Sequence, residues 1–204
     1  MSVRVKICGI RRLEDALLAA QLGASAIGFV FWPGSPRFVD PFRARRIASA
    51  LPPFVSTVGV FVNQPPEHAT SIARLLNLAA IQLHGDEDPA PFMRTGARII
   101  KAVPVNARFS DDTLGSIPPE VTILLDAQDP VRRGGTGQTI DWSVAARVAA
   151  SRRTILSGGL NPDNVQSAVE QVRPYGLDVS SGVESAPGVK DPEKLRTLFA
   201  RIRG

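Results

Sequence analysis

Eight apolar, strand-like runs recur along the sequence at a nearly constant interval, and this regularity constrains the fold more than any other feature. Their ends, from Cys8 to Ser180, follow one another about every 25 residues. Segments with helical periodicity separate them. The runs are Val3–Gly9, Ala26–Phe31, Ser56–Asn63, Ala80–His84, Arg98–Val105, Val121–Asp126, Thr154–Ser157 and Leu177–Ser180.

Strands that alternate with helices predict an α/β protein built on a parallel sheet. Eight such units in a chain of 204 residues favour a closed (β/α)8 TIM barrel of near-minimal length, a single catalytic domain over residues 1–204. An open doubly wound sheet fits less well, because no Gly-x-Gly-x-x-Gly motif follows the first strand.

Several helix boundaries are also readable. The segment Arg12–Leu22 has a helical pattern that ends at Gly23. Asn161 is expected to cap another helix, with Pro162 as its first residue. The fifth strand connection, Phe109–Ile117, is short and polar, so its helical signal is the weakest.

Composition limits the location and the partners. A single cysteine allows no internal disulfide, which is typical of the cytoplasm. The net charge of +5 suggests nucleic acid, but the arginines are scattered and only 6% of residues are aromatic, so a solvated basic surface is the better interpretation. We see no secretory signal and no apolar run of membrane-spanning length. The sequence does not distinguish a monomer from a homodimer.

Chemically capable side chains gather at the predicted strand ends, where barrel enzymes place their active sites. Cys8 closes the first strand and Asp126 the sixth, while Asp178 lies just inside the eighth. Arg37 lies in a proline-stiffened loop that suits a planar carboxylate. His84 ends the fourth strand, where it either contacts the substrate or bonds only to its neighbours.

Small residues follow three consecutive strands and predict a phosphate site. Their backbone N–H groups can approach a phosphoryl oxygen closely, and the loops after strands seven and eight are the usual phosphate site of a barrel. We therefore expect a phosphorylated small molecule as the ligand. The residues expected to bind it are Gly134, Gly135, Gly158, Gly159, Ser180 and Ser181.

Other site chemistries have little support. Only two histidines accompany the single cysteine, so we expect no metal site. No Gly-x-Ser-x-Gly motif points to a serine hydrolase, and the loop at Gly134 lacks the Gly-Lys-Ser/Thr ending of a nucleotide P-loop.

The order and spacing of these short motifs resemble the phosphoribosylanthranilate isomerase family over essentially the whole chain. The segments that carry the resemblance are Val5–Ile10, Phe29–Phe31, Ser35–Arg37, Gly59–Asn63, Gln82–Gly85, Leu124–Asp126, Gly134–Gly137, Ser157–Leu160 and Asp178–Glu184. One departure is Trp32, which is expected only to shape the anthranilate pocket.

The resemblance implies an Amadori rearrangement of N-(5-phosphoribosyl)anthranilate in tryptophan biosynthesis, without a cofactor. By matching motif, Cys8 is the general base that removes the C2 proton, and Asp126 is the general acid that opens the furanose ring. Arg37 holds the anthranilate carboxylate, and Asp178 faces the sugar hydroxyls or the amine.

Three alternatives remain for comparison. The sister isomerase of histidine biosynthesis resembles this chain but has an aspartate in the first strand and two phosphate sites, whereas no glycine loop follows Asn63 here. Indoleglycerol phosphate synthase needs a lysine acid, for which Lys101 is the only candidate. A non-catalytic phosphosugar-binding barrel would bind without turnover, which the Cys8 and Asp126 pair argues against.

Overall fold

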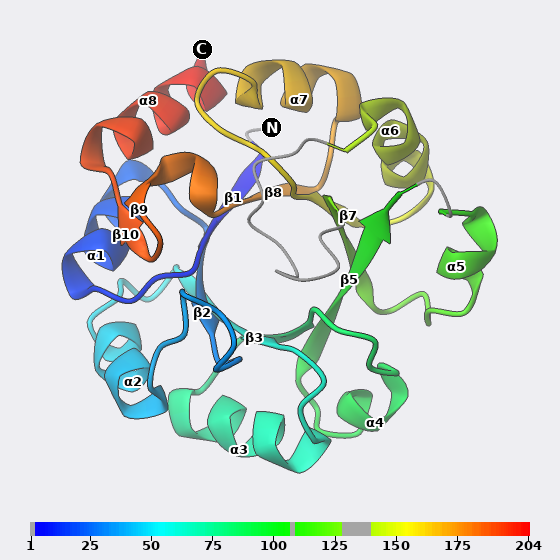
Figure 1. Cartoon of the computed structure of the whole chain (residues 1–204), viewed down its shortest axis with the longest axis horizontal. Helices are drawn as coiled ribbons and strands as arrows, with labels where there is room; N and C mark the ends of the chain where they lie inside the picture. Colours follow the sequence, from blue (N-terminus) through cyan, green and yellow to red (C-terminus); the bar gives the residue numbers. More distant parts are fainter. Residues whose placement is uncertain (1–2, 107–108, 128–139) are drawn as a thin grey trace.

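The predicted barrel is present in the computed structural model, which describes residues 3–106, 109–127 and 140–204. Within these residues, strands β1 to β8 form a closed sheet in which each strand pairs in parallel with the next and β8 pairs with β1. The helices form a ring around this sheet (Figure 1). The chain is therefore a TIM barrel, as the spacing of its apolar runs predicts.

The strand bounds agree with the predicted runs to within two residues at each end. The strands are β1 (Arg4–Cys8), β2 (Ala26–Val30), β3 (Ser56–Phe61), β4 (Ala80–Leu83), β5 (Arg98–Val105), β6 (Thr122–Ala127), β7 (Thr154–Leu156), β8 (Gly176–Val179), β9 (Glu184–Ala186) and β10 (Val189–Lys190). The helices are α1 (Leu13–Leu22), α2 (Pro41–Ser49), α3 (Pro66–Leu76), α4 (Ala90–Met93), α5 (Asp111–Gly115), α6 (Trp142–Ser151), α7 (Val165–Val172) and α8 (Pro192–Arg203). None of the helices described is both long and apolar enough to span a bilayer.

Two apolar layers result from the alternation of side chains along each strand. Outward-facing residues such as Ile7 and Phe61 are buried against the helices in the main core. Inward-facing residues, among them Val58, Ile100 and Leu124, fill the barrel interior. Several inward positions nearer the carboxyl ends of the strands carry polar side chains, among them Gln82, Asp126 and Asp178, and they form the site described below.

Helix boundaries follow local hydrogen bonding. Gly23 ends α1 in the left-handed conformation with φ of 106°, as predicted. The predicted start of α7 is wrong, because the helix begins at Val165 rather than at Pro162. The side-chain oxygen of Asn161 accepts the backbone N–H groups of Asp163 and Asn164, so this segment forms a turn before the helix.

The third strand is shorter than predicted, since it ends at Phe61 instead of Asn63. Asn63 adopts the left-handed conformation, with φ of 52°, which an extended strand does not accommodate. Its backbone N–H donates to Glu87 at 2.5 Å. The strand therefore stops where the chain bends toward the loop that follows β4.

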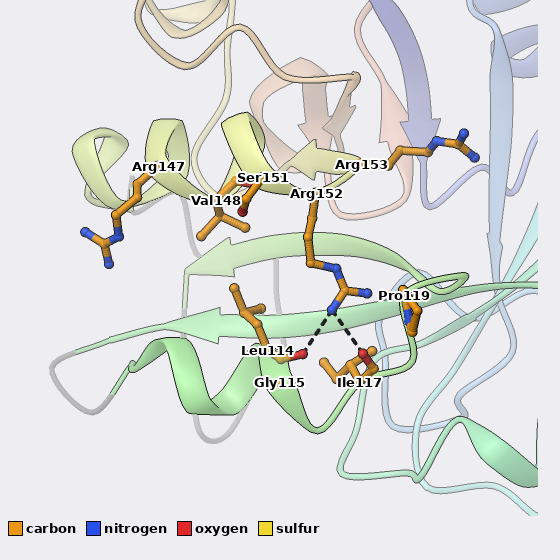
Figure 2. Close-up of a pocket in the computed structure, with 9 residues that line it drawn as sticks. All are labelled: Leu114, Gly115, Ile117, Pro119, Arg147, Val148, Ser151, Arg152 and Arg153. Atoms are coloured by element: carbon orange, nitrogen blue, oxygen red, sulfur yellow. Dashed lines mark hydrogen bonds between the residues drawn. The ribbon is translucent and has the colours of Figure 1, made fainter.

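Arg152 fixes the connection between α5 and β6, where the predicted helical signal is weakest. Its Nη1 donates to the carbonyls of Leu114 and Ile117 at 2.9 and 3.0 Å, as Figure 2 shows. Its Nη2 donates to the carbonyls of Pro118 and Val121 at 2.7 and 3.1 Å. One guanidinium thus satisfies four carbonyl groups of a segment that forms only a short helix.

Candidate active site

The two predicted acid–base residues occupy inward positions at the carboxyl ends of separate strands. Cys8 is the last residue of β1 and is 8% exposed, whereas Asp126 lies in β6 and is 6% exposed. In the closed barrel, β7 and β8 lie between these two strands. The loops that follow β7 and β8 are therefore placed between Asp126 and Cys8 around the rim.

The surroundings of Cys8 are polar on one side. Lys6 lies two residues earlier on the same face of β1, and its Nζ donates to Asp178 Oδ1 and to Gln82 Oε1, both at 2.9 Å. Burial raises the pKa of the Cys8 thiol, and the Lys6 ammonium opposes this without cancelling it. Burial alone would lower the pKa of Lys6, but Asp178 and Cys8 outweigh it and raise that pKa.

Asp126 is held by two donors. Its Oδ1 accepts the backbone N–H of Ala127 at 2.9 Å, and its Oδ2 lies 3.1 Å from Nε2 of His84. The other ring nitrogen of His84 lies 2.9 Å from Nε2 of Gln82. His84 therefore contacts both Gln82 and Asp126.

Arg37 is ion-paired with a residue that the sequence did not indicate. Its Nε and Nη2 donate to the two carboxylate oxygens of Glu184 at 2.9 and 2.7 Å. Lys190, whose side chain is fully buried, donates to Glu184 at 2.9 Å and to the Ser180 carbonyl at 3.0 Å. Burial would raise the pKa of Glu184, but Arg37 and Lys190 lower it. Burial lowers the pKa of Lys190.

The loops after β7 and β8 have the backbone that a phosphate site needs. Gly158 and Gly159 adopt φ of 86° and 64°, values that favour glycine. A Cβ on Gly182 would lie 1.9 Å from the Leu160 carbonyl, so the two loops touch and only glycine fits there. Ser181 begins a short 3-10 turn. Gly134 and Gly135 lie outside the described residues.

Four contributors to the site were missed by the sequence analysis. Lys6 and Gln82 each lie two positions before a predicted site residue, so the period-two alternation of a strand could have identified them. Glu184 and Lys190 had no comparable signal, because the Arg37 to Glu184 pair joins residues 147 apart in the sequence.

Together these groups can move a proton at each of two places around a bound anion. A buried thiol and a buried carboxyl group flank the glycine loops, and a guanidinium lies beside them. Within the described part of the chain, no three histidine, cysteine or acidic side chains are arranged to hold a metal ion.

Comparisons with known proteins agree with this geometry. A family model described as N-(5'phosphoribosyl)anthranilate (PRA) isomerase matches residues 5–201. An N-(5'-phosphoribosyl)anthranilate isomerase from Geobacter sulfurreducens is 50% identical over 99% of each chain.

Solved structures of isomerases superpose closely. One was determined in complex with reduced 1-(o-carboxyphenylamino)-1-deoxyribulose 5-phosphate; it is 45% identical over 99% of each chain, with a TM-score of 0.87. Another shows monomers generated from the dimeric enzyme of Thermotoga maritima; it is 43% identical over 99% of each chain, with a TM-score of 0.86. The chain therefore belongs to the phosphoribosylanthranilate isomerase family.

Proposed function

We propose that the chain converts N-(5-phosphoribosyl)anthranilate into 1-(2-carboxyphenylamino)-1-deoxyribulose 5-phosphate, a step of tryptophan biosynthesis, with Cys8 as general base and Asp126 as general acid. The observation that carries these roles is the position of both groups on inward faces of the barrel rim, on either side of the glycine loops after β7 and β8. A sugar phosphate held by those loops lies between a proton donor and a proton acceptor.

The reaction is an isomerisation in which protons are moved and none is gained or lost overall. Asp126 gives a proton to the furanose oxygen as the C1–O bond breaks, which leaves an iminium group at C1. Cys8, as thiolate, removes the proton from C2 and forms an enolamine. The enolamine then becomes the ketone when C1 gains a proton and the C2 hydroxyl loses one. No electron acceptor is required.

The remaining side chains supply binding sites for the two ends of the substrate. The Arg37 to Glu184 pair leaves Nη1 of Arg37 outside its two hydrogen bonds, and this group is available to the anthranilate carboxylate. Trp32 packs beside Val30, Val60 and Cys8, which gives an apolar surface for the aromatic ring. Gly158, Gly159, Ser180 and Ser181, together with Gly134 and Gly135, bind the phosphate in this proposal.

Asp178 faces the sugar hydroxyls or the amine in this proposal. Its carboxylate accepts from Lys6 within the barrel, where both side chains are buried. In our proposal Asp178 therefore acts on the sugar hydroxyls or the amine only through the oxygen that Lys6 does not use.

The end of the barrel at β3 and β4 argues against the bisphosphorylated substrate of the sister isomerase. There the carboxylate of Glu87 accepts the backbone N–H groups of Asn63 and Gly85. Those N–H groups are therefore occupied by a carboxylate, and its negative charge would repel a second phosphate at this end of the barrel.

The decisive experiment follows the fluorescence of phosphoribosylanthranilate, generated in place, as the purified protein consumes it. We expect Cys8→Ser to fold normally and to lose at least about 100-fold in rate, because a hydroxyl is a far weaker base than a thiolate. Wild-type turnover by Cys8→Ser would refute the mechanism. Product binding without any turnover by the native chain would instead support the non-catalytic phosphosugar-binding barrel. Turnover should also survive exhaustive EDTA treatment.

We further propose that residues 1–204 act as one catalytic domain on a phosphorylated small molecule in the cytoplasm, without nucleic acid or membrane partners. The single cysteine and the scattered arginines support this location and these partners. Light scattering on the purified chain will distinguish the monomer from the homodimer.

A further inference from the structure

A continuous chain of side-chain hydrogen bonds crosses the barrel interior and ends on Asp126. Lys6 donates to Oε1 of Gln82, Gln82 contacts Nδ1 of His84, and Nε2 of His84 contacts Asp126. The distances are 2.9, 2.9 and 3.1 Å. Lys6 and Gln82 are buried, at 5% and 1% exposed, so water does not replace these partners.

The chemistry of the first member fixes the order of donors and acceptors. An ammonium has three donors and no acceptor, so only the carbonyl oxygen of Gln82 can face Lys6. A rotated Gln82 amide would place its NH2 group against the ammonium, which is a contact between two donors. The NH2 group of Gln82 consequently faces His84 Nδ1, and that nitrogen must be the acceptor.

The tautomer of His84 follows from this order. Because Nδ1 accepts a hydrogen bond, the proton of the neutral ring lies on Nε2, which points at Oδ2 of Asp126. The other carboxylate oxygen of Asp126 already accepts the backbone N–H of Ala127. Each oxygen therefore has one of its lone pairs occupied by a donor from the protein.

We propose that Lys6 and Gln82 are positioning residues for the isomerisation: they hold His84 as the Nε2–H tautomer, which prevents Asp126 from donating its proton to the ring. With the opposite tautomer, Nε2 would accept that proton in a hydrogen bond and turn it away from the substrate. With the tautomer set by Gln82, a proton on Asp126 has to use a lone pair that neither His84 nor Ala127 occupies. This inference rests on the proposed role of Asp126 as the acid.

Nitrogen NMR of the imidazole rings tests the tautomer directly. The chain has only two histidines, and His68 is exposed on α3, so a His68→Asn variant leaves the signal of His84 alone. We expect native His84 to carry its proton on Nε2. A proton on Nδ1 of the otherwise native ring would overturn the proposal, whatever the variants do.

Gln82→Glu replaces the donor that faces Nδ1 of His84 by an acceptor, with almost no change in the shape of the side chain. A carboxylate only accepts, so the proton of the neutral His84 ring should move from Nε2 to Nδ1, and kcat should fall at least about tenfold, part of what a general acid contributes. KM should stay within about threefold, because Arg37 and the phosphate loops are unchanged. The matched control, Gln166→Glu on the exposed face of α7, should alter neither the tautomer nor kcat.

Two results on these variants would overturn the proposal. One is a Gln82→Glu protein in which the His84 proton has moved from Nε2 to Nδ1 while kcat stays native. The other is a loss of kcat without any change at His84, which would indicate a merely structural role. If Gln82→Glu fails to fold, Gln82→Met serves instead, and it should give a mixture of tautomers with a lower kcat. Native activity of Asp126→Asn would show that Asp126 is not the general acid, and the measured tautomer of His84 would be unaffected by that result.

Discussion

Arg37 and Glu184 form a two-point ion pair at 2.9 and 2.7 Å, although the sequence places them in loops after the second and eighth strands. Lys190 also donates to Oε1 of this carboxylate, at 2.9 Å. The three side chains carry one net positive charge, which suits the carboxylate of the substrate. The guanidinium is thus oriented before any substrate arrives.

Arg37→Ala should raise KM for the anthranilate-bearing substrate by about 10-fold to 150-fold, the equivalent of the 1.5–3 kcal/mol of a hydrogen bond to a charged group. A phosphoribosyl compound without the carboxylate should lose much less affinity. Steady-state kinetics and calorimetry with both compounds measure the difference. Arg43→Ala, on the exposed face of α2, is the control. Equal losses for the two compounds would remove Arg37 from this role.

Asp126→Asn should lose about 100-fold to 10,000-fold in kcat and keep product affinity within about tenfold, because an amide cannot supply the proton that opens the ring. Rapid-mixing kinetics with substrate generated in place give kcat, and product titration gives the affinity. If kcat is unaffected, Asp178 becomes the next candidate for the acid.

The barrel was predictable because its signal is repeated. Each strand, from β1 to β8, begins as an apolar run, and the nearly constant spacing of the eight runs indicates one architecture. The predicted start of α7 failed, because Asn161 uses its side chain to close a turn before Pro162 can begin a helix. Proline and asparagine favour both structures, so local sequence does not decide between them.

Candidate site residues could be predicted from the sequence where a chemically capable side chain lies at the end of a strand. Cys8, Asp126 and His84 stood out because chemically capable residues at a barrel rim are informative. The partners of these residues were not readable in the same way. The alternation of side chains along a strand places Lys6 on the face of Cys8, but only the closed barrel shows that it contacts Asp178 and Gln82. Glu184 comes into contact with Arg37 only in the folded chain.

Gly159→Val should weaken the binding of inorganic phosphate and of product alike. Gly159 has a φ of 64°, so a branched side chain there should move the loop and block the approach of the phosphate oxygens to its N–H groups. Competitive inhibition by phosphate measures the effect. Gly115→Ala is the control, since a Cβ at Gly115 meets nothing within 4 Å. An unchanged inhibition constant for phosphate would exclude the loop after β7 from the site.

Arg152→Ala should lower the free energy of unfolding by about 2–4 kcal/mol, since four carbonyl groups, two of them drawn in Figure 2, lose a charged donor. Arg152→Lys should retain only part of this stabilisation, because an ammonium cannot span the same four acceptors. Urea unfolding followed by circular dichroism measures both. The neighbouring Arg153→Ala loses only an exposed stacking contact on Tyr175, about 0.5–1 kcal/mol. Equal losses at the two positions would contradict the bracing role.

The reactivity of Cys8 should show in which direction its pKa is shifted. Burial raises that pKa, so the thiolate should form at a higher pH than that of a free cysteine, whose pKa is about 8.5. Iodoacetamide labelling, followed by intact mass, should give a single adduct and a half-maximal rate at a pH above that of a free thiol. Bound product should slow the labelling.

The neighbours of Cys8 supply opposite controls for this profile. The Lys6 ammonium lowers the pKa of the thiol and the Asp178 carboxylate raises it. Lys6→Met should therefore move the labelling midpoint to still higher pH, and Asp178→Asn should move it down. If both variants shift the midpoint in the same direction, the change reports loosened packing around Cys8 rather than the charges beside it. A native midpoint at or below that of free cysteine would show that the ammonium outweighs burial.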